Sequence, residues 1–387
     1  MSQHEPSYKT AVTDVTGTSN EVALAGNSME PEALYRASPS FQMWKIESLT
    51  RSSAEAAADT DATPALAGES DETQELSTGK EIESVGRLYT IKAIAGKGKG
   101  LVAATKILKG TRILSEVPMF RVPRDNPDIE ALERIVAKEV ECLNKDQQRT
   151  FFDLRNVHGN AYSRSLGIAK TNVLPLGSKA RFGGLFPEAS RINHSCRHNS
   201  QNTWNENIGR LTIHALRDIE EGEEITITYL AITSEYADRQ RFLKEKFKFD
   251  CKCELCSLPR AQRKRSDARL KEIQTIDSSI GYFFWGGLES ERALHLLHKM
   301  FGLFEKENIW DASIARAYKD AYDIAIESGD KPRARVFAER TYDARRLIEG
   351  DDSPVTMRMK RIAEGLSAEA QGLSGLDFEN WLWMLPS

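Results

Sequence analysis

Hydrophobic and polar positions change their spacing along this chain. Residues 1–80 contain few large apolar side chains, so this segment cannot bury enough surface to offset its ordering entropy. From about residue 81, short apolar and β-branched runs broken by glycine and proline predict several short strands. We therefore expect a disordered N-terminal tail, followed by a fold that begins near residue 81.

Helical spacing interrupts the strands between about residues 127 and 156. There Ile129, Leu132, Val136 and Val140 recur at three- and four-residue steps, as on one face of a helix. Strand alternation returns in GRLTIHAL and EEITITYL, on either side of an acidic turn that contains glycine. Many short strands with a helical insert predict an α+β fold of several small sheets rather than alternating β/α units.

The last third of the chain has a helical pattern. Helix periodicity dominates from about residue 259, as in ESERALHLLHKMFGLFEK, DASIARAYKDAYDIAIESG and KPRARVFAERTYDARRLIEG. The last two segments are joined by Ser328-Gly329-Asp330 and resemble a helical hairpin of tetratricopeptide length. This predicts an all-helical, TPR-like C-terminal region.

Charge is distributed unevenly. The net charge is −4, but the first 80 residues hold five basic and thirteen acidic side chains, so the tail is strongly acidic. No apolar run is long enough for a membrane span, and the N-terminus lacks the pattern of a secretory or mitochondrial leader. We expect a protein of the nucleus or cytoplasm, with no membrane partner.

The five cysteines point to a metal. An odd number without a secretory signal argues against a disulfide framework, and Cys251, Cys253 and Cys256 fall within six residues in FDCKCELC. Zinc prefers four thiolate or imidazole ligands, so three local thiols leave one position open. Cys196 is the first candidate for the fourth ligand; the alternatives are His194, His198 and Cys142.

Three other segments carry polar chemistry but are weak signals alone. The glycines of GKGKGL at 96–101 allow a tight turn and close approach to a ligand, and its two lysines could receive a carboxylate. RINHSC at 191–196 combines hydrogen-bonding side chains with a thiol, which leaves a Cys-His hydrolase as an alternative. Tyr229 ends GEEITITY, where a packed aromatic is the simplest interpretation.

In this order, GKGKGL, NVLPL, GLFPEASRINHSC, GEEITITY and FDCKCELC resemble the SET-domain protein lysine methyltransferases, specifically the SET-and-MYND group and its fungal relatives. The likeness runs from about Val85 to Cys256. It implies methyl transfer from S-adenosylmethionine to a lysine of a histone or another protein. It also implies a SET domain at 81–232 and a post-SET zinc segment at 233–258, between the disordered tail at 1–80 that the composition predicts and the helical domain at 259–387 that the periodicity predicts.

The resemblance implies a role for individual residues. Tyr229 would lie beside the methyl-transfer channel, and Phe249 would pack on the cofactor. The post-SET zinc would be bound by Cys196, Cys251, Cys253 and Cys256. The residues expected to contact the cofactor are Lys97, Gly98, Lys99, Gly100, Leu101, Asn172, Ser190, Ile192, Asn193, His194, Tyr229 and Phe249.

Two features depart from the family pattern. The cysteine-rich MYND module is missing, because residues 118–191 contain only Cys142, and His198 stands where a proline is frequent. The alternative function is a binding or scaffold protein with a catalytically weak SET domain, in which the helical C-terminal half and the acidic tail recruit partners. The basic run at 260–271 suggests nucleic-acid contact only weakly, since such runs are typical of solvated helix faces, and a monomer is expected.

Overall fold

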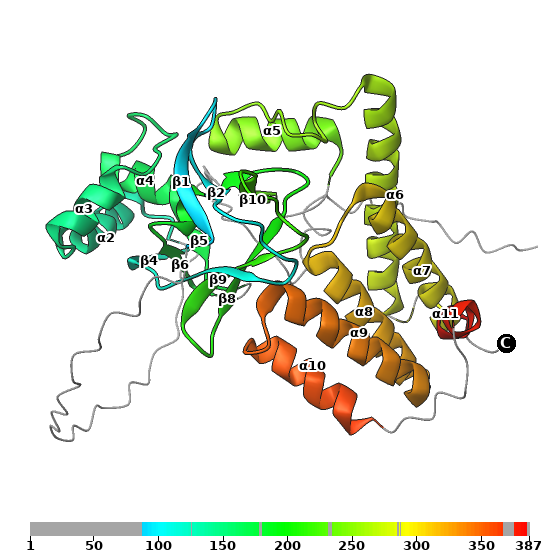
Figure 1. Cartoon of the computed structure of the whole chain (residues 1–387). Helices are drawn as coiled ribbons and strands as arrows, with labels where there is room; N and C mark the ends of the chain where they lie inside the picture. Colours follow the sequence, from blue (N-terminus) through cyan, green and yellow to red (C-terminus); the bar gives the residue numbers. More distant parts are fainter. Residues whose placement is uncertain are drawn as a thin grey trace, which may run out of the picture. The chain divides into compact units, whose positions relative to one another are not determined.

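The computed structural model describes residues 87–124, 126–177, 180–230, 234–284, 286, 288–366 and 375–384 (Figure 1). The predicted acidic tail lies outside the described residues. The predicted α+β architecture, several small sheets with a helical insert and a helical C-terminal region, is confirmed. No helix in the described ranges has the length and apolar character needed to cross a membrane.

Three small sheets are present in the described part of the chain. The first has the order β1-β2-β10-β7, the second β3-β9-β8 and the third β4-β6-β5. Their strands are β1 (Tyr89–Ile94), β2 (Gly98–Ala103), β3 (Arg112–Glu116), β4 (Phe120–Pro123), β5 (Leu174–Pro175), β6 (Phe182–Leu185), β7 (Asn193–His194), β8 (Ser200–Asn205), β9 (Arg210–Ala215) and β10 (Glu224–Ile227).

The first sheet brings distant segments together. Gly96, in the turn between β1 and β2, and Gly98, the first residue of β2, have φ of +73° and +83°, which glycine adopts at little cost. Strand β10 pairs with β2 on one side, where Ile225 lies opposite Leu101, and with β7 on the other, in parallel. The glycine-rich segment and the NHSC segment are thus separated by a single strand.

The two strands flanking the acidic turn both form, but they belong to different sheets. Strand β9 forms a hairpin with β8, the strand before it in the chain. In this pairing Arg210 lies opposite Asn205, and Ala215 lies opposite Ser200. The acidic turn, with Gly222 at φ +82°, then leads the chain into β10 of the first sheet. On the way from β9 to β10, Ile219 forms an isolated antiparallel bridge with Ile107, which lies between β2 and β3.

The helical insert contains α2 (Ile129–Glu141), α3 (Lys145–Phe152) and α4 (Arg164–Asn172). Leu132, Val136 and Val140 of α2 are buried, as their spacing predicted. Asp128 accepts from the backbone N–H of Ala131 at the start of α2, as an N-cap does. Helix α4 lies beyond the predicted range of the insert and ends at Asn172.

A short helix precedes the NHSC segment, and a longer helix precedes the cysteine run. The 3-10 helix η1 (Ala189–Arg191) directly precedes β7, and α5 (Tyr236–Phe247) directly precedes the cysteine run. Helix α5 ends at Phe247, and its C-cap residue Lys248 has φ +60°, so the chain turns sharply toward the cysteines there.

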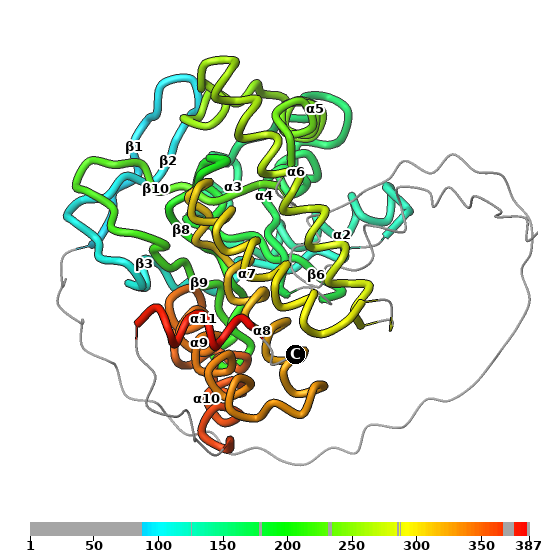
Figure 2. Tube along the Cα trace, turned by 90° about the vertical axis from the view of Figure 1, so that its right-hand side faces the viewer, coloured from blue at the N-terminus to red at the C-terminus, as the bar shows by residue number. Residues whose placement is uncertain are grey.

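The C-terminal region consists of consecutive helices, which Figure 2 shows following one another along the chain. The predicted hairpin is α8 with α9, joined through Gly329 at φ +75°. Its buried face is rich in alanine, which permits close helix approach. The helices are α6 (Arg260–Phe283), α7 (Ser290–Glu307), α8 (Ala312–Glu327), α9 (Lys331–Glu349), α10 (Pro354–Gly365) and α11 (Gly375–Trp383).

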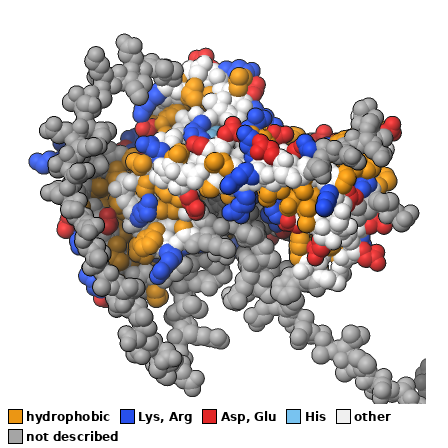
Figure 3. All heavy atoms as spheres, turned by 90° about the horizontal axis from the view of Figure 1, so that it is seen from below, with side chains coloured by type: hydrophobic (Ala, Val, Ile, Leu, Met, Phe, Trp, Pro, Cys, Tyr) orange, Lys and Arg blue, Asp and Glu red, His pale blue; other side chains and the backbone are white. Residues whose placement is uncertain are grey.

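Side chains of the basic run at the start of α6 take part in packing. Arg269 forms an ion pair with the buried Glu307, and the guanidinium of Arg263 lies over the Tyr236 ring. On the face drawn in Figure 3, basic and acidic side chains are intermixed over the described residues. These contacts give Arg263 and Arg269 a structural role, whereas Arg260, Lys264, Arg265 and Lys271 are exposed.

The turn after α9 fastens the helices to the second sheet. Arg112 of β3 pairs with Asp352, and the backbone oxygen of Asp352 accepts from Asn207 at 2.8 Å. Gly350 makes this turn possible, since its φ is +85° and a side chain there would collide with the Arg112 guanidinium.

We predict that Gly350→Ala lowers the free energy of unfolding by about 2–4 kcal/mol, through backbone strain and displacement of Arg112. Urea unfolding measures the change. Gly302→Ala is the control, because the added methyl group meets no atom within 4 Å other than those of its own chain neighbours and nearby α7 backbone. This substitution should raise the free energy of unfolding by up to about 1 kcal/mol, through the higher helix propensity of alanine. Equal stability of the two variants would contradict this account of the turn.

Candidate functional site

Four thiols from two distant segments meet in one cluster. Cys196 follows β7, and Cys251, Cys253 and Cys256 follow α5; their four Sγ atoms lie within 4.8 Å of one another. The Cys196 sulfur is 3.9 Å from that of Cys251 and 3.6 Å from that of Cys256. Four sulfurs around a tetrahedral zinc stand about 3.8 Å apart, so the cluster has the dimensions of a zinc site.

None of the three alternative fourth ligands belongs to the thiol cluster. Cys142 is exposed at the C-terminal end of α2, and the ring of His198 faces Asp311 at 3.7 Å. His194 contacts the cluster without joining it, because its Nε2 is 3.3 Å from the Cys196 sulfur. This is also the distance of a Cys-His catalytic pair, but a thiol surrounded by three others is placed as a metal ligand rather than as a free nucleophile.

The His194 ring links the cysteine cluster to Tyr229. Its Nδ1 accepts from the backbone N–H of Tyr229 at 3.0 Å, which assigns the ring proton to Nε2 and makes it a donor to Cys196. Burial lowers the pKa of His194 to about 3, so the ring is neutral. Both ring nitrogens are engaged within the protein, and neither is free to bind a metal or cofactor.

Tyr229 is fixed at both ends. While its backbone N–H donates to His194, its phenol Oη donates to the backbone oxygen of Ile192 at 2.7 Å. Its ring packs against Phe247 at 4.7 Å between centroids. Burial, and then the Glu224 carboxylate, raise the pKa of Tyr229, so it is a neutral phenol at physiological pH.

Asn193 joins the NHSC segment to the glycine-rich strand. Its Nδ2 donates to the backbone oxygen of Lys99 at 3.3 Å and to Glu224 at 2.9 Å. A Cβ on Gly100 would stand 2.6 Å from that Nδ2, so this contact requires glycine. A Cβ on Gly96 or Gly98 would meet no atom within 4 Å, so the turn has open space beside it that a ligand can approach.

Both lysines of the glycine-rich segment are ion-paired. Lys97 contacts Glu224 at 2.5 Å, and Lys99 contacts Asp153 at 2.6 Å. Asp153 also contacts Arg191 at 2.9 Å, and the hydrogen bond from Lys99 is the main cause of its lowered pKa. Asp153 and Glu224 could not be singled out from the sequence, since neither has a local pattern that sets it apart from other acidic residues.

The remaining predicted site residues form a neighbouring group. The Asn172 side chain donates to the backbone oxygens of Arg155 at 2.6 Å and Ile168 at 2.7 Å. Ser190 donates to the Asn172 backbone oxygen at 2.8 Å, which joins the end of α4 to η1. The Phe249 ring lies 6.2 Å from that of His194, whereas the side chain of Leu101 is buried in the core.

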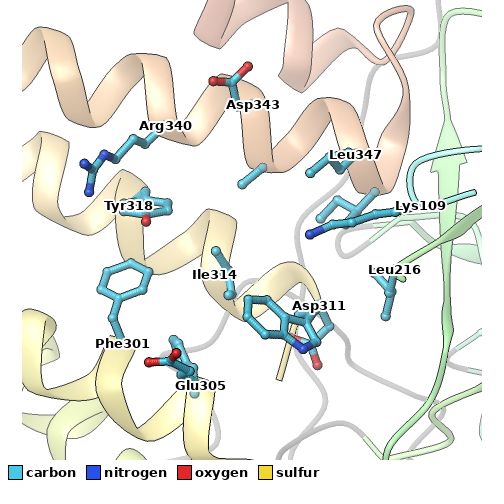
Figure 4. Close-up of a pocket in the computed structure, with 14 residues that line it drawn as sticks. Lys109, Leu216, Phe301, Glu305, Asp311, Ile314, Tyr318, Arg340, Asp343 and Leu347 are labelled. Carbon is cyan, nitrogen blue, oxygen red and sulfur yellow. The ribbon is translucent and has the colours of Figure 1, made fainter. Parts of the chain in front are cut away.

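A cleft of about 400 Å³ lies away from these residues (Figure 4). Its walls come from α7, α8 and α9, together with Lys109 and Leu216 of the strand region. None of the predicted site residues lines it, and its lining includes basic and acidic side chains as well as aromatic ones. The cleft therefore does not mark the candidate site.

Comparison with known proteins supports the family assignment. A profile of the SET domain matches residues 98–230, the span from the glycine-rich strand to the residue after Tyr229. The chain is 33% identical over 310 residues to "Histone-lysine N-methyltransferase set5" of Schizosaccharomyces pombe, and the match covers 76% of this chain and 94% of that protein.

Other relatives match over shorter spans. "Histone-lysine N-methyltransferase SMYD3" of Homo sapiens is 33% identical over 227 residues, 56% of this chain and 49% of that protein. "Histone-lysine N-methyltransferase ASHR1" of Arabidopsis thaliana is 39% identical over 126 residues, 32% of this chain and 25% of that protein. The SET domain match and the nearly full-length similarity to set5 together show that this chain belongs to the SET-domain protein lysine methyltransferases.

Proposed function

We propose that this chain transfers methyl groups from S-adenosylmethionine to lysine side chains of histones, in the nucleus or cytoplasm. One observation carries the proposal: the two residues of β7 connect the glycine-rich strand, Tyr229 and the cysteine cluster. Asn193 contacts the glycine-rich strand, while His194 contacts both Tyr229 and the cysteine cluster. The names of the relatives support histones as the substrate class.

When bound, S-adenosylmethionine supplies a methyl carbon on a sulfonium, from which the lysine nitrogen displaces the sulfur directly. The N–C bond forms as the C–S bond breaks, and the amine must have lost its proton to water to attack. A free lysine has a pKa of about 10.4, and apolar surroundings lower it. The rings of Tyr229, Phe247 and Phe249 provide such surroundings.

Tyr229 positions the amine rather than accepting its proton. A neutral phenol with a raised pKa is a poor base, but its oxygen can accept a hydrogen bond from the amine while its own O–H still donates to the backbone oxygen of Ile192. This hydrogen bond would align the nitrogen for displacement, and alignment accounts for much of the rate in such reactions.

The cofactor contacts divide into two kinds. The glycine turn is open at Gly96 and Gly98 and offers backbone groups, to which Lys97, Lys99 and Gly100 would add theirs. The ammonium groups of Lys97 and Lys99 are paired with Glu224 and Asp153, so either would have to exchange that partner for the cofactor carboxylate. The side chains of Leu101, Asn172 and His194 are buried or bonded within the protein, so these residues would contribute backbone groups. The proposed cofactor site is completed by Ser190, Ile192, Asn193, Tyr229 and Phe249.

Zinc in this protein would be structural. Cys196, Cys251, Cys253 and Cys256 supply four ligands, which fill a tetrahedral zinc and leave no open coordination position. The metal would therefore hold the site together and take no part in methyl transfer.

The proposal is tested by incubating the purified chain with S-adenosylmethionine carrying a tritiated methyl group and core histones, with serum albumin as a comparison protein. We expect label on histone lysines, located by mass spectrometry. Cofactor binding without transfer to any protein would overturn the proposed activity and favour the scaffold alternative. Preferential labelling of albumin would overturn only the substrate class.

We predict that Tyr229→Phe lowers kcat about 100-fold, because one oriented hydrogen-bonding group is lost, and changes cofactor affinity less than about threefold. Steady-state methyl transfer and calorimetry with S-adenosylhomocysteine measure the two effects. Tyr282→Phe, at an exposed position of α6, serves as the control. A normal kcat in Tyr229→Phe would show that the Tyr229 hydroxyl takes no part in methyl transfer.

We also predict that Asn193→Ala weakens S-adenosylhomocysteine binding at least about tenfold, since the link between β7 and the glycine-rich strand is lost. Calorimetry gives the dissociation constants. The matched control is Asn160→Ala, at an exposed position. Unchanged affinity in Asn193→Ala would place the cofactor away from this strand.

A further inference from the structure

Helix α5 presents a buried arginine to the cysteine cluster. Arg239 is 2% exposed, and its Nη2 lies 4.0 Å from the Cys256 sulfur, within the range of a hydrogen bond to sulfur. Its Nη1 donates to the backbone oxygen of Ser234, and its Nε has no hydrogen-bond partner in the described part of the chain. A buried guanidinium with a free donor needs negative charge beside it.

The adjacent residue on α5 also serves the cluster. Gln240 donates through Nε2 to the backbone oxygen of Cys251 and accepts at Oε1 from its backbone N–H, both at 2.9 Å. One side chain therefore satisfies both backbone groups of a cysteine. Together, Arg239 and Gln240 fix one cysteine from each end of the CKCELC run.

Charge explains why an arginine stands here. Zinc binds cysteines as thiolates, so a zinc ion with four of them carries a net charge of 2−. The described polar groups that reach the sulfurs from outside the cluster are a neutral His194 donor at Cys196 and the cationic Arg239 at Cys256. Of these two, only Arg239 brings a full positive charge.

Arg239 also connects the cluster to the helical C-terminal region. Its Nη1 lies 3.6 Å from Asp267 of α6, whose Oδ1 accepts from the backbone N–H of Tyr236 at the start of α5 at 2.8 Å. The guanidinium therefore stands between the Asp267 carboxylate and the Cys256 sulfur. When Cys256 is a zinc-bound thiolate, both groups are negatively charged and both are attracted to the same guanidinium.

We propose that Arg239 is the positioning residue of the metal centre: its charge stabilises the zinc-bound Cys256 thiolate and so slows loss of the metal. The inference rests on the proposed zinc site. It goes beyond that site by assigning a residue outside the cysteine motifs, and by making Asp267 a competitor for the same guanidinium.

The test uses the full zinc-loaded chain with Arg239→Met, Arg239→Lys and Arg241→Met. Arg241 lies two positions along α5, exposed and paired with Asp238, so its variant controls for loss of one arginine from this helix. Zinc transfer to a chromophoric chelator gives the release rate. Cobalt(II) substitution gives the energy of the thiolate-to-metal charge-transfer band, which reports on the sulfurs and not on folding.

Arg239→Met should release zinc at least about tenfold faster and shift the cobalt band, while Arg239→Lys stays closer to the parent protein and Arg241→Met matches it. Asp267→Asn keeps an acceptor for Tyr236 but removes the competing charge, so it should slow release and shift the band in the opposite direction. This variant decides the matter if Arg239→Met does not fold.

The assignment of Arg239 would be overturned if Arg239→Met released zinc at the rate of the parent protein and kept its cobalt band position. If Arg239→Met is unfolded, the same result in Asp267→Asn would overturn it. Absence of stoichiometric zinc from the parent protein would overturn the proposed zinc site instead. The two failures are therefore distinguishable.

Discussion

The contact on which the candidate site depends is the meeting of four thiols from segments far apart in the chain. Cys196 stands 55 residues before Cys251, yet their sulfurs lie 3.9 Å apart. Strand β7 comprises only Asn193 and His194, and a two-residue strand has too few ladder hydrogen bonds to hold its own position. A metal bound by the four thiols would anchor the end of that strand, and with it the middle of the site.

From this anchor a chain of hydrogen bonds runs to Tyr229. The Cys196 sulfur accepts from Nε2–H of His194, and Nδ1 of His194 accepts from the backbone N–H of Tyr229. The Tyr229 phenol donates to the backbone oxygen of Ile192, just before β7. The tyrosine is thus held from both sides before any substrate binds. Such preorganisation suits a reaction that needs alignment more than acid or base catalysis.

The sequence predicted those parts of the molecule that have a local pattern. Short strands, the apolar face of α2, the α8–α9 hairpin and the clustering of cysteines follow from spacing and composition alone. The position of β10 between β2 and β7 could not be predicted in this way, because strand pairing depends on partners distant in the chain. Asp153, Glu224 and Arg239 were likewise missed, since an isolated charged residue in sequence gives no sign of the ion pair or thiol that it meets in the fold.

Hydrogen exchange with and without zinc tests the central claim that the metal holds the strand of the site. The amide of Ser195 bonds to Ile227, that of Tyr229 bonds to His194, and both lie outside the cysteine run. Removal of zinc should accelerate exchange at these two amides as strongly as at residues 249–256, and leave the β8–β9 hairpin protected. Acceleration confined to residues 249–256 would contradict the claim.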